Sequence, residues 1–416
     1  MREQWKRKKV ADLVEPLTTI DPRKEPGKNF TYIDVSSVSR SACKIDATTL
    51  VKGSDAPSRA RRLVKAGDVI FATIRPTLQR IAEIPNSLDG AVCSTGYFVL
   101  RPKPEILSKF LFYSLFAPEF FYAMAALQRG AAYPAVSDGD VKGQELFIPP
   151  LPEQKRIVTI LDDAFEEIDT VVANTENNLA NARELFDSYL NSVFSQRGEG
   201  WVEMRLEEIV SSTQIGLVRN RKEQGENLEH GYVKMDNITP YNRFDGKNIV
   251  RVEADKPEVE KYRLKKDDLL FNTRNSYELV GKSCLYDIDK EEPVLFNNNI
   301  MRIRFVGEIY PNFAAYLFYS PKVKKQLESM KSGTTNVSAI YYKSLKDIRL
   351  AFPSLDTQKT ICRRLDEMSA RTQKLEAIYQ QKLTALAELK QSLLHKAFSG
   401  ELTVERAESA VEEATA

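Results

Sequence analysis

The chain has 416 residues, of which 42% are hydrophobic and 28% carry a charge, with a formal net charge of +2. This length is too great for one hydrophobic core and predicts two to four domains. No stretch approaches the roughly 18 to 20 apolar residues of a membrane span, and no apolar run follows the charged N-terminus. We therefore expect a globular, cytoplasmic protein with no membrane partner.

Cysteine and histidine are too sparse for the sites that they commonly build. The cysteines form no CxxC pair and lie far apart, at Cys43, Cys93, Cys284 and Cys362. Such spacing argues against a zinc site or a disulfide framework and predicts reduced, partly buried thiols. Two histidines, His230 and His395, argue against a metal centre or a histidine relay. We expect no metal in this chain.

Residues 1–150 form the first predicted domain. Short β-branched runs bounded by turn residues predict strands at TYIDV (31–35), DVIFATI (68–74) and GYFVL (96–100). The stretch ILSKFLFYSLF (106–116) predicts a helix. The mixture indicates an α/β or α+β domain built on a curved sheet. This domain is net basic, which suits an acidic polymer such as nucleic acid.

Residues 151–197 predict one long helix. It opens at PPLPEQKRIVTILDDAFEEID (149–169), and no proline or glycine then occurs until Gly198. Pro152 fits the first helical turn, where its missing N–H costs nothing. Apolar residues recur on alternating steps of four and three, with polar exceptions at Thr175 and Asn178. This 3.5-residue period predicts a coiled-coil seam made by Ile157, Leu161, Ile168, Val171, Leu185 and Tyr189.

The second half of the chain repeats the first at an offset of about 200 residues. Matches in the same order include Tyr32 with Tyr232, Asp68 with Asp268, Phe71 with Phe271, Thr73 with Thr273 and Gly130 with Gly333. Their shared order and near-constant offset indicate a duplicated unit and not a solenoid, whose repeats run to tens of residues. Residues 198–353 therefore form the second predicted domain.

A second long helix is predicted at 354–398, followed by a tail at 399–416. Its expected seam is Ile361, Leu365, Met368, Leu375, Tyr379, Leu386, Leu389 and Leu393. About 40 residues make a rod of roughly 60 Å. Two such rods in one chain most simply pack on each other. The predicted fold is α+β: two α/β-type domains separated by two long helices in an antiparallel coiled coil, with a pseudo-two-fold repeat. Trp5 would then lie near the end of the second helix, and Trp201 near the end of the first.

Motifs for catalysis are missing from the sequence. We find no phosphate-binding loop, dinucleotide turn, HExxH or GxSxG, and no methyltransferase tetrapeptide. A nuclease carboxylate cluster has looser spacing, and Asp138 and Asp140 are the nearest candidates for one. A polar turn explains these two residues more simply. We therefore expect a binding and scaffolding protein and not an enzyme.

The two helical segments resemble those of a known family. They open with PPLPEQKRIVTILD and SLDTQKTICRRLD and close with SYLNSVFS and LKQSLLHKAFSGEL. With two diverged domains between them, the whole chain resembles the specificity (S) subunit of type I restriction-modification enzymes. The second opening departs from the pattern, because Thr357 stands in the glutamate position, while Gln358, Ile361 and Leu365 stay in place.

The resemblance implies a function in DNA recognition. Each domain would be a target recognition domain that reads one half of a split, asymmetric sequence in double-stranded DNA. The helices would hold the domains apart and dock two modification (methyltransferase) subunits, and restriction/translocase subunits would join for cleavage. S-adenosylmethionine, ATP and Mg²⁺ would belong to those partners, and this chain would hold no cofactor. We also expect the opening of the first helix to contact partner subunits.

Three aligned stretches supply side chains suited to reading bases, because they combine polar groups with strand ends. The first stretch gives Ser36, Ser39, Arg40 and Asn237. The second gives Arg75, Thr77, Gln79 and Arg80 in copy one, and Arg274, Asn275 and Tyr277 in copy two. The third gives Tyr133, Thr334, Thr335 and Asn336. The second stretch differs most between the copies, beside a retained strand, as different readout on one scaffold requires.

Two other functions remain open from the sequence. A repeat scaffold that binds only protein partners would also have two domains and two helices, and its basic domains would be incidental. A nuclease with a hidden site would require metal-dependent cleavage that depends on Asp138 and Asp140.

Overall fold

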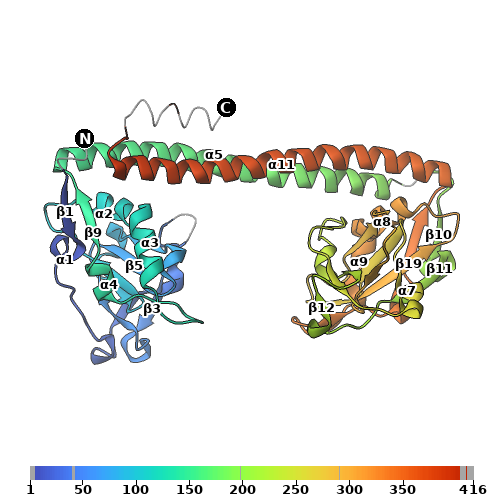
Figure 1. Ribbon diagram of the computed structural model, residues 1–416, viewed down its shortest axis with the longest axis horizontal. Helices are drawn as coiled ribbons and strands as arrows, with labels where there is room; N and C mark the ends of the chain where they lie inside the picture. The colour runs from blue at the N-terminus through green and yellow to red at the C-terminus, as the bar shows by residue number, and fades with distance from the viewer. Residues whose placement is uncertain (1–4, 40–42, 197, 290, 403–408, 410–416) are drawn as a thin grey trace. The chain divides into compact units, whose positions relative to one another are not determined.

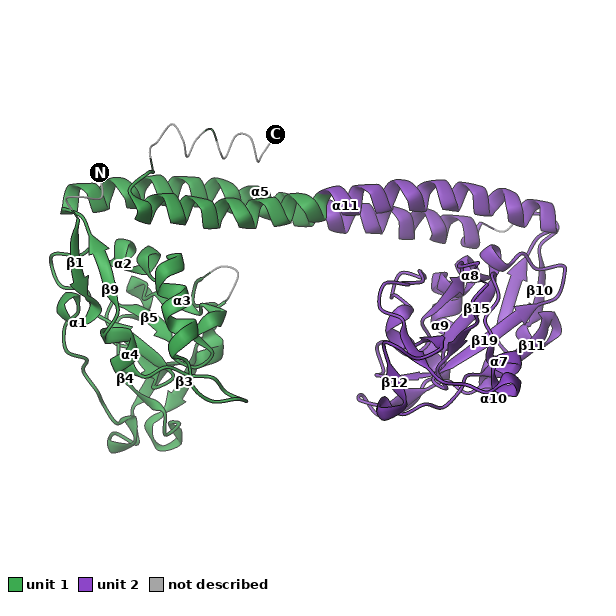
Figure 2. Cartoon of the chain, in the orientation of Figure 1, with its two compact units in different colours: residues 1–177, 379–416 green, residues 178–378 purple. Residues whose placement is uncertain are grey.

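The computed structural model describes residues 5–39, 43–196, 198–289, 291–402 and 409. The chain divides into two compact units (Figure 2). Unit 1 comprises Met1–Asn177 and Tyr379–Ala416, and unit 2 comprises Asn178–Ile378. Each unit joins one globular domain to part of each long helix (Figure 1). The boundary between the two units therefore falls inside each long helix and not at a helix end.

The globular domain of unit 1 is built on two small sheets. One has the strand order β3-β2-β7-β4 and the other β6-β5-β8. All their pairings are antiparallel except β2 with β7. The strands are β2 (Asn29–Ile33), β3 (Thr49–Lys52), β4 (Ala60–Leu63), β5 (Val69–Ala72), β6 (Ile81–Glu83), β7 (Val92–Ser94) and β8 (Tyr97–Leu100). The helices are α1 (Val10–Leu13), α2 (Ser108–Ser114), α3 (Pro118–Leu127) and α4 (Asp138–Lys142).

Unit 2 repeats this plan. Its two larger sheets have the orders β12-β14-β13-β18 and β11-β19-β15-β17, and β13 with β18 is again the parallel pair. Their strands are β11 (Val210–Ile215), β12 (Gln224–Gly225), β13 (His230–Val233), β14 (Val250–Val252), β15 (Asp268–Asn272), β17 (Ser283–Tyr286), β18 (Val294–Phe296) and β19 (Ile300–Phe305). A further small sheet joins β16 (Arg274–Asn275), β21 (Ser338–Ala339) and β20 (Ser332–Gly333). The helices are α6 (Leu206–Ile209), α7 (Lys256–Tyr262), α8 (Pro311–Tyr319), α9 (Pro321–Met330) and α10 (Tyr342–Leu345).

A buried ion pair recurs at the aligned aspartates. Asp68 precedes β5 and accepts hydrogen bonds from Arg101 (2.7 Å) and from the backbone N–H of Lys65 (2.8 Å). Asp268, at the start of β15, accepts in the same way from Arg304 (2.9 Å) and from the N–H of Lys265 (2.7 Å). A buried carboxylate needs partners, and here an arginine and a backbone N–H supply them in each unit.

The two long helices are α5 (Leu151–Ser195) and α11 (Leu355–Ser399), of 45 residues each. In unit 1, Lys390 of α11 forms an ion pair with Asp169 of α5, and Arg156 donates to the carbonyl of Leu402 (3.1 Å). Residue numbers therefore rise along one helix as they fall along the other. In unit 2, Arg183 of α5 pairs with Glu376 of α11 (3.1 Å). The antiparallel coiled coil predicted from the sequence is confirmed.

The apolar seam follows the prediction over most of its length. Ile157, Leu161, Ile168, Leu365, Leu386 and Leu393 are buried, and Val171, Tyr189, Ile361, Met368, Tyr379 and Leu389 are half-buried. The prediction is wrong at Leu185 and Leu375, which are 56% and 39% exposed. Asn178 also faces solvent.

The buried stripe moves by one residue at these points. Phe186 is buried in place of Leu185, and the half-buried Glu376 replaces Leu375. An α-helix has 3.6 residues per turn and drifts from a strict 3.5-residue repeat. Near its end, α5 also packs on a globular domain, since the ring of Phe186 lies 6.3 Å from that of Tyr316 on α8. Near this end of α5, contact with the globular domain therefore determines which residues are buried, in place of the heptad pattern.

Each globular domain is closed where the chain enters and leaves it. In unit 1, β1 (Lys6–Lys9) pairs with β9 (Glu145–Ile148). In unit 2, β10 (Val202–Arg205) pairs with β22 (Arg349–Phe352). The preceding tryptophans lie where we expected them. Trp5 meets Phe110 (ring centroids 6.4 Å apart), which contacts Phe398 near the end of α11, and Trp201 meets Phe194 near the end of α5 (6.5 Å).

Within the described part of the chain, no single helix has both the length and the apolar composition of a membrane span. The bent pair α2 and α3 passes that test only when its two helices are taken together. Phe110, Leu111 and Phe120 from this pair lie in the core of unit 1.

Candidate functional site

The opening of each long helix is attached to its domain by a buried glutamine. Gln154 is fully buried and donates to the carbonyls of Pro149 (2.9 Å) and Glu105 (3.0 Å). Its own carbonyl accepts from the N–H of Leu107 (2.9 Å). One side chain thus makes hydrogen bonds with three backbone groups, one just after β9 and two just before α2.

The second helix opening is built in the same way. Gln358 is fully buried, donates to the carbonyls of Pro353 and Glu308 (2.9 Å each), and accepts from the N–H of Tyr310 (2.9 Å). Thr357, which departs from the family pattern, is exposed and takes no part.

A tyrosine–aspartate pair strengthens each attachment. Tyr113 of α2 donates to Asp162 (2.5 Å), and Tyr316 of α8 donates to Asp366 (2.6 Å). Burial and, after it, the hydrogen bond to the aspartate raise the pKa of each tyrosine. The glutamine and aspartate that recur in the two helix openings therefore hold helix to domain. Lys155 and Asp163 of the first opening are exposed.

In unit 1 the second and third polar stretches come together. Ile74 and Ala135 form a β-bridge, the N–H of Arg75 donates to the carbonyl of Pro134 (2.7 Å), and the N–H of Val136 donates to Thr73 (2.9 Å). The guanidinium of Arg75 lies over the ring of Tyr133, 5.2 Å from its centroid. Both side chains are exposed, Tyr133 to 72%.

The same two stretches meet in unit 2. Arg274 and Asn275 in β16 pair with Ala339 and Ser338 in β21, and the N–H of Tyr277 donates to the carbonyl of Thr335 (3.0 Å). We call these paired segments, 73–80 with 129–136 and 273–277 with 332–339, the loop pair of each unit.

A glycine with positive φ turns the third stretch in both copies, at Gly130 (φ +99°) and Gly333 (φ +124°). A Cβ at position 333 would collide with the carbonyl oxygen of Val337, so only glycine fits there without strain. The glycine turn of the loop pair is therefore retained between the copies, whereas the backbone differs at the aligned Arg75 and Asn275.

The two loop pairs expose different side chains. Unit 1 exposes Arg75 and Tyr133, whereas unit 2 exposes Arg274 together with Thr334, Thr335 and Asn336. Tyr277 is 41% exposed and lies beside Lys331, whose ammonium is 4.5 Å from the ring centroid. The amide of Asn275 is occupied, since it donates to Asn272 (2.9 Å) and accepts from the N–H of Ser276 (2.8 Å).

The structure corrects the prediction for Asn237. This residue is 4% exposed; it accepts from the N–H of Lys234 and donates to the carbonyl of Asp245 (2.8 Å each). Each end of its amide makes a hydrogen bond that closes a turn, and burial limits access to the rest of its hydrogen-bonding capacity.

Arg80 is also used inside the fold. It donates to the carbonyl of Val35 (2.8 Å), and at the aligned position Lys282 donates to the carbonyl of Ile238 (2.6 Å). In each unit, a cationic side chain just before β6 or β17 thus forms a hydrogen bond with the backbone beside or within the first polar stretch. The equivalence of Arg80 and Lys282 follows from the structure, because each directly precedes the strand that pairs with β5 or β15.

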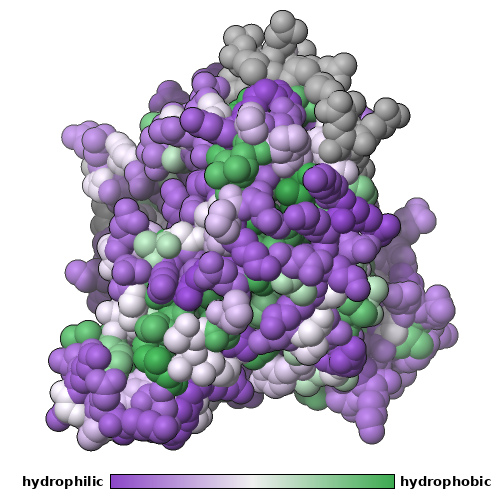
Figure 3. Space-filling model, turned by 90° about the vertical axis from the view of Figure 1, so that its left-hand side faces the viewer, coloured by the Kyte–Doolittle hydropathy of each residue, from purple (hydrophilic) through white to green (hydrophobic). Residues whose placement is uncertain are grey.

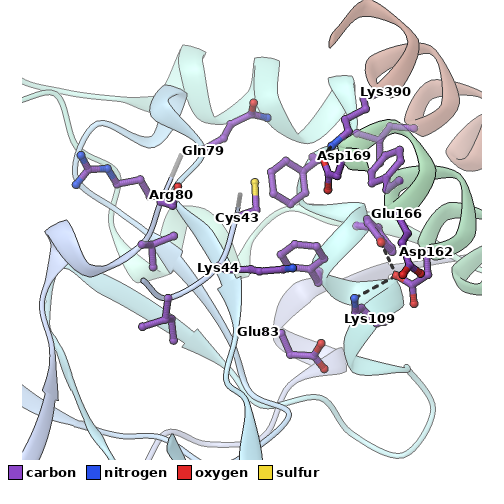
Figure 4. A pocket seen from close by; sticks show the side chains of 18 of the residues that line it. Cys43, Lys44, Gln79, Arg80, Glu83, Lys109, Asp162, Glu166, Asp169 and Lys390 are labelled. Atoms are coloured by element: carbon purple, nitrogen blue, oxygen red, sulfur yellow. Dashed lines mark hydrogen bonds and ion pairs between the residues drawn. The ribbon is translucent and has the colours of Figure 1, made fainter. Parts of the chain in front are cut away.

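The remaining candidates of unit 1 line a cavity of about 1930 Å³ between its globular domain and its two helical segments (Figure 4). Ser36, Ser39, Thr77 and Gln79 contribute to its wall. Across from them stand two ion pairs, Lys109 with Asp162 (3.1 Å) and Lys390 with Asp169. Arg40 lies outside the described residues.

Unit 2 joins the aligned loop to its helices by charge. Arg243, in the loop after residue 238, donates to Glu376 (3.1 Å), which also pairs with Arg183 (3.1 Å). The Arg183 guanidinium lies 5.1 Å from the ring centroid of Tyr241 in the same loop. We call this set the Glu376 latch.

The carboxylates considered for a nuclease site have other partners. Asp138 pairs with Arg62 (2.8 Å) and Asp140 with Arg129 (3.2 Å). Asp140 also accepts from the backbone and hydroxyl of Ser137, and these hydrogen bonds lower its pKa. Both residues thus stabilise the start of α4. Within the described residues, no group of three or more side chains is arranged to hold a metal ion.

The outer face of unit 1 in Figure 3 is mostly hydrophilic, and its apolar residues occur in small, separate groups. Large continuous apolar patches mark protein or membrane contacts, and this face displays none in the part that the structure describes.

Comparison with known proteins places the chain in a family. The family model for the type I restriction modification DNA specificity domain matches twice, at residues 2–180 and 198–385. The EcoKI specificity subunit of Escherichia coli K12 is 24% identical over 98% of this chain and 91% of its own length. The StySPI specificity subunit of Salmonella potsdam is 23% identical over 98% and 91%.

Solved structures agree with the sequence relatives. A chain from the structure described as "Structural basis underlying complex assembly and conformational transition of the type I R-M system" has a TM-score of 0.76 and 26% identity, covering 96% of this chain and 98% of that one. The HsdS subunit from Thermoanaerobacter tengcongensis has a TM-score of 0.52 and 26% identity over 96% and 97%. With both copies of the family domain matched and the fold shared, the chain belongs to the specificity subunits of type I restriction-modification systems.

Proposed function

We propose that each globular domain reads one half of a bipartite, asymmetric target in double-stranded DNA. The observation that carries this proposal is the loop pair, which follows the same strand and contains the same glycine turn in both units but displays different polar side chains. Arginine, asparagine and threonine are side chains that discriminate base edges. Two domains that read different half-sites require a shared scaffold that carries different side chains.

The exposed candidates on these loops are Arg75 and Tyr133 in unit 1, and Arg274, Tyr277, Thr334, Thr335 and Asn336 in unit 2. Ser36, Ser39, Thr77 and Gln79 would contribute from the cavity wall, as contacts to sugar and phosphate or to bases. Arg80 and Asn237 have structural roles and are left out of the proposed reading surface.

We further propose that the helix pair docks two methyltransferase subunits. In unit 2, Leu185 and Leu375 each precede a seam position by one residue. In an antiparallel pair this offset turns both side chains to the same side. Ile378, 48% exposed, precedes Tyr379 in the same way. Three exposed apolar side chains on one side of two helices suit a helix-binding partner.

The chemistry would then reside in the other subunits. S-adenosylmethionine would be bound by the modification subunits, and ATP and Mg²⁺ by the restriction/translocase subunits, with no catalytic group or cofactor in this chain. The family membership supports this division, since the family is one of DNA specificity subunits.

A methylome comparison tests the proposal. Genomic DNA is sequenced for methylation in cells with this chain, without it, and with residues 1–150 replaced by the matching domain of a relative. We expect a split methylation motif that disappears without the chain and changes in only one half after the replacement. Methylation that is unchanged by the replacement would leave a scaffold that binds only protein as the better explanation.

A further inference from the structure

We propose that Arg75, positioned by the ring of Tyr133, selects a guanine in the half-site read by unit 1. This inference rests on the proposed function and deepens it, because it names one side chain and the base that it recognises.

The backbone holds Arg75 in an uncommon conformation. Its φ of +50° and ψ of +59° lie in the left-handed region, which residues other than glycine seldom adopt. Gln79, four residues later, has a φ of +48°, and the short 3-10 helix Pro76–Leu78 lies between them. The β-bridge of Ile74 with Ala135 fixes the loop on its neighbour. Such strain persists only where the surrounding structure enforces it, and it clusters at functional sites.

The conformation is specific to unit 1. Two other non-glycine residues with positive φ, Cys43 and Asn242, are aligned partners in the two copies and belong to a shared turn. Asn275, aligned with Arg75, lies instead in strand β16. The strained loop is therefore a difference between the two copies, as different readout requires.

The guanidinium of Arg75 differs from those of other arginines in its domain. Arg62 and Arg101 of the same domain are bound to Asp138 and Asp68. For Arg75 the structure shows contact with the face of Tyr133, 5.2 Å from its centroid, and among the described residues no hydrogen-bond acceptor for its side chain. The π-face attracts the cation without consuming any of its N–H donors.

This arrangement suits one base better than the others. A planar guanidinium donates two parallel hydrogen bonds to O6 and N7 of guanine in the major groove. An arginine already held on an aromatic ring loses less conformational freedom on binding. Tyr133 is 72% exposed, so the pair is accessible to a duplex. Tyr133 acts here as a positioning residue, and Arg75 as the group that touches the base.

The test measures methylation by the complex of this chain with its methyltransferase subunits on a DNA library that carries all four bases at each position. We expect R75A to reduce the preference for guanine at one position of one half-site by about ten-fold to a hundred-fold. The other half-site should keep its sequence. R75K should weaken the preference, since an ammonium lacks the planar fork that lies on the Tyr133 ring and donates two parallel hydrogen bonds.

Variants of Tyr133 separate positioning from mere folding. Y133F keeps the ring and should preserve the preference, whereas Y133A should weaken it at the same position as R75A. K52A changes an exposed cation of the same domain and should leave every base preference unchanged. Thermal unfolding of each variant complex checks that the domain remains folded.

The outcomes distinguish this inference from the proposed function. If the unmodified complex shows no split sequence preference, the proposed function fails. If it reads a split motif and R75A leaves all preferences unchanged, the assignment of Arg75 is overturned and the function stands. If R75A lowers methylation equally on all sequences, Arg75 contacts phosphate and not guanine, which also overturns the inference.

Discussion

At the scale of single residues, the buried glutamines explain why the helix openings look alike. Gln154 and Gln358 each satisfy three backbone groups that burial would otherwise leave without partners. A shorter or apolar side chain cannot replace all three hydrogen bonds. The sequence pattern therefore records a packing requirement as well as a family resemblance.

We expect Gln358→Ala to lower the free energy of unfolding of unit 2 by about 3 kcal/mol, because buried carbonyls and an N–H lose their partners. Chemical denaturation followed by a probe in unit 2 measures the change. Gln373→Ala is the matched control on the same helix, where an exposed amide reaches only Ser369, and should cost less than about 0.5 kcal/mol. Equal costs for the two variants would contradict the assigned role.

The cysteines give a second prediction at this scale. Cys93, Cys284 and Cys362 are buried and Cys43 is half-buried, in keeping with the partly buried thiols expected from the sequence. Burial raises the pKa of all four, for Cys362 to about 12. Because the thiolate is the reactive form, we expect slow alkylation of the native protein at pH 8, with Cys43 first. Mass spectrometry of alkylated peptides checks this order, and rapid labelling of Cys284 would contradict it.

At the residue scale, the sequence could predict the residues that recur at matching positions in the two copies. The aligned Asp68 and Asp268 and the repeated glycines were visible as matches. Whether a polar side chain faces solvent or the interior was not visible. Asn237 and Asn336 are both asparagines near turns, yet the first is bound on both sides and the second is exposed. Only tertiary contacts separate them.

At the scale of elements, the helices were predicted to within two residues at each end, since proline and long uninterrupted periodicity mark them strongly. The seam prediction was wrong at Leu185 and Leu375. There the periodicity alone could not foresee that a domain, and not only the partner helix, covers one side of the pair. The small sheets were foreseen only as strands, because their pairing joins segments far apart in the sequence.

The outward leucines lead to a prediction about assembly. The double variant Leu185→Asp, Leu375→Asp should reduce the methyltransferase subunits bound per chain from two to one, because only the proposed surface of unit 2 is changed. Native mass spectrometry of the complex gives the stoichiometry. Leu50→Asp changes a leucine that is 70% exposed in β3 and should leave two subunits bound. Two subunits on the double variant would place docking elsewhere.

The Glu376 latch gives a prediction about local mobility. Glu376→Ala removes the partner of Arg183 and Arg243, so the loop at 239–245 should exchange its amide hydrogens faster. The effect on global stability should be small, about 0.5 kcal/mol, since Arg183 is partly exposed. Hydrogen exchange with mass spectrometry measures both. Glu388→Ala, on the exposed surface of the same helix, should leave the loop unchanged.

At the scale of the whole molecule, the proposed function makes helix length a determinant of the target. One extra heptad in both helices adds about 10 Å of rise. At roughly 3.4 Å per base pair, we expect the gap between the half-sites to grow by about three base pairs while both half-sites keep their sequences. Methylome sequencing of the lengthened variant reports the gap directly. An unchanged gap would mean that the helices do not set it.

Unit 1 is assembled from both ends of the chain, and this has a consequence for biosynthesis. Its core joins Trp5 and Phe110 to Leu394, Phe398 and Leu402. A ribosome makes the chain from the N-terminus, so the domain that emerges first waits for almost the last segment to complete its core. Unit 2, whose residues are continuous, has no such delay. The nascent protein should therefore finish its second domain first, and a translational stop near residue 380 should leave unit 1 vulnerable to proteases while unit 2 survives.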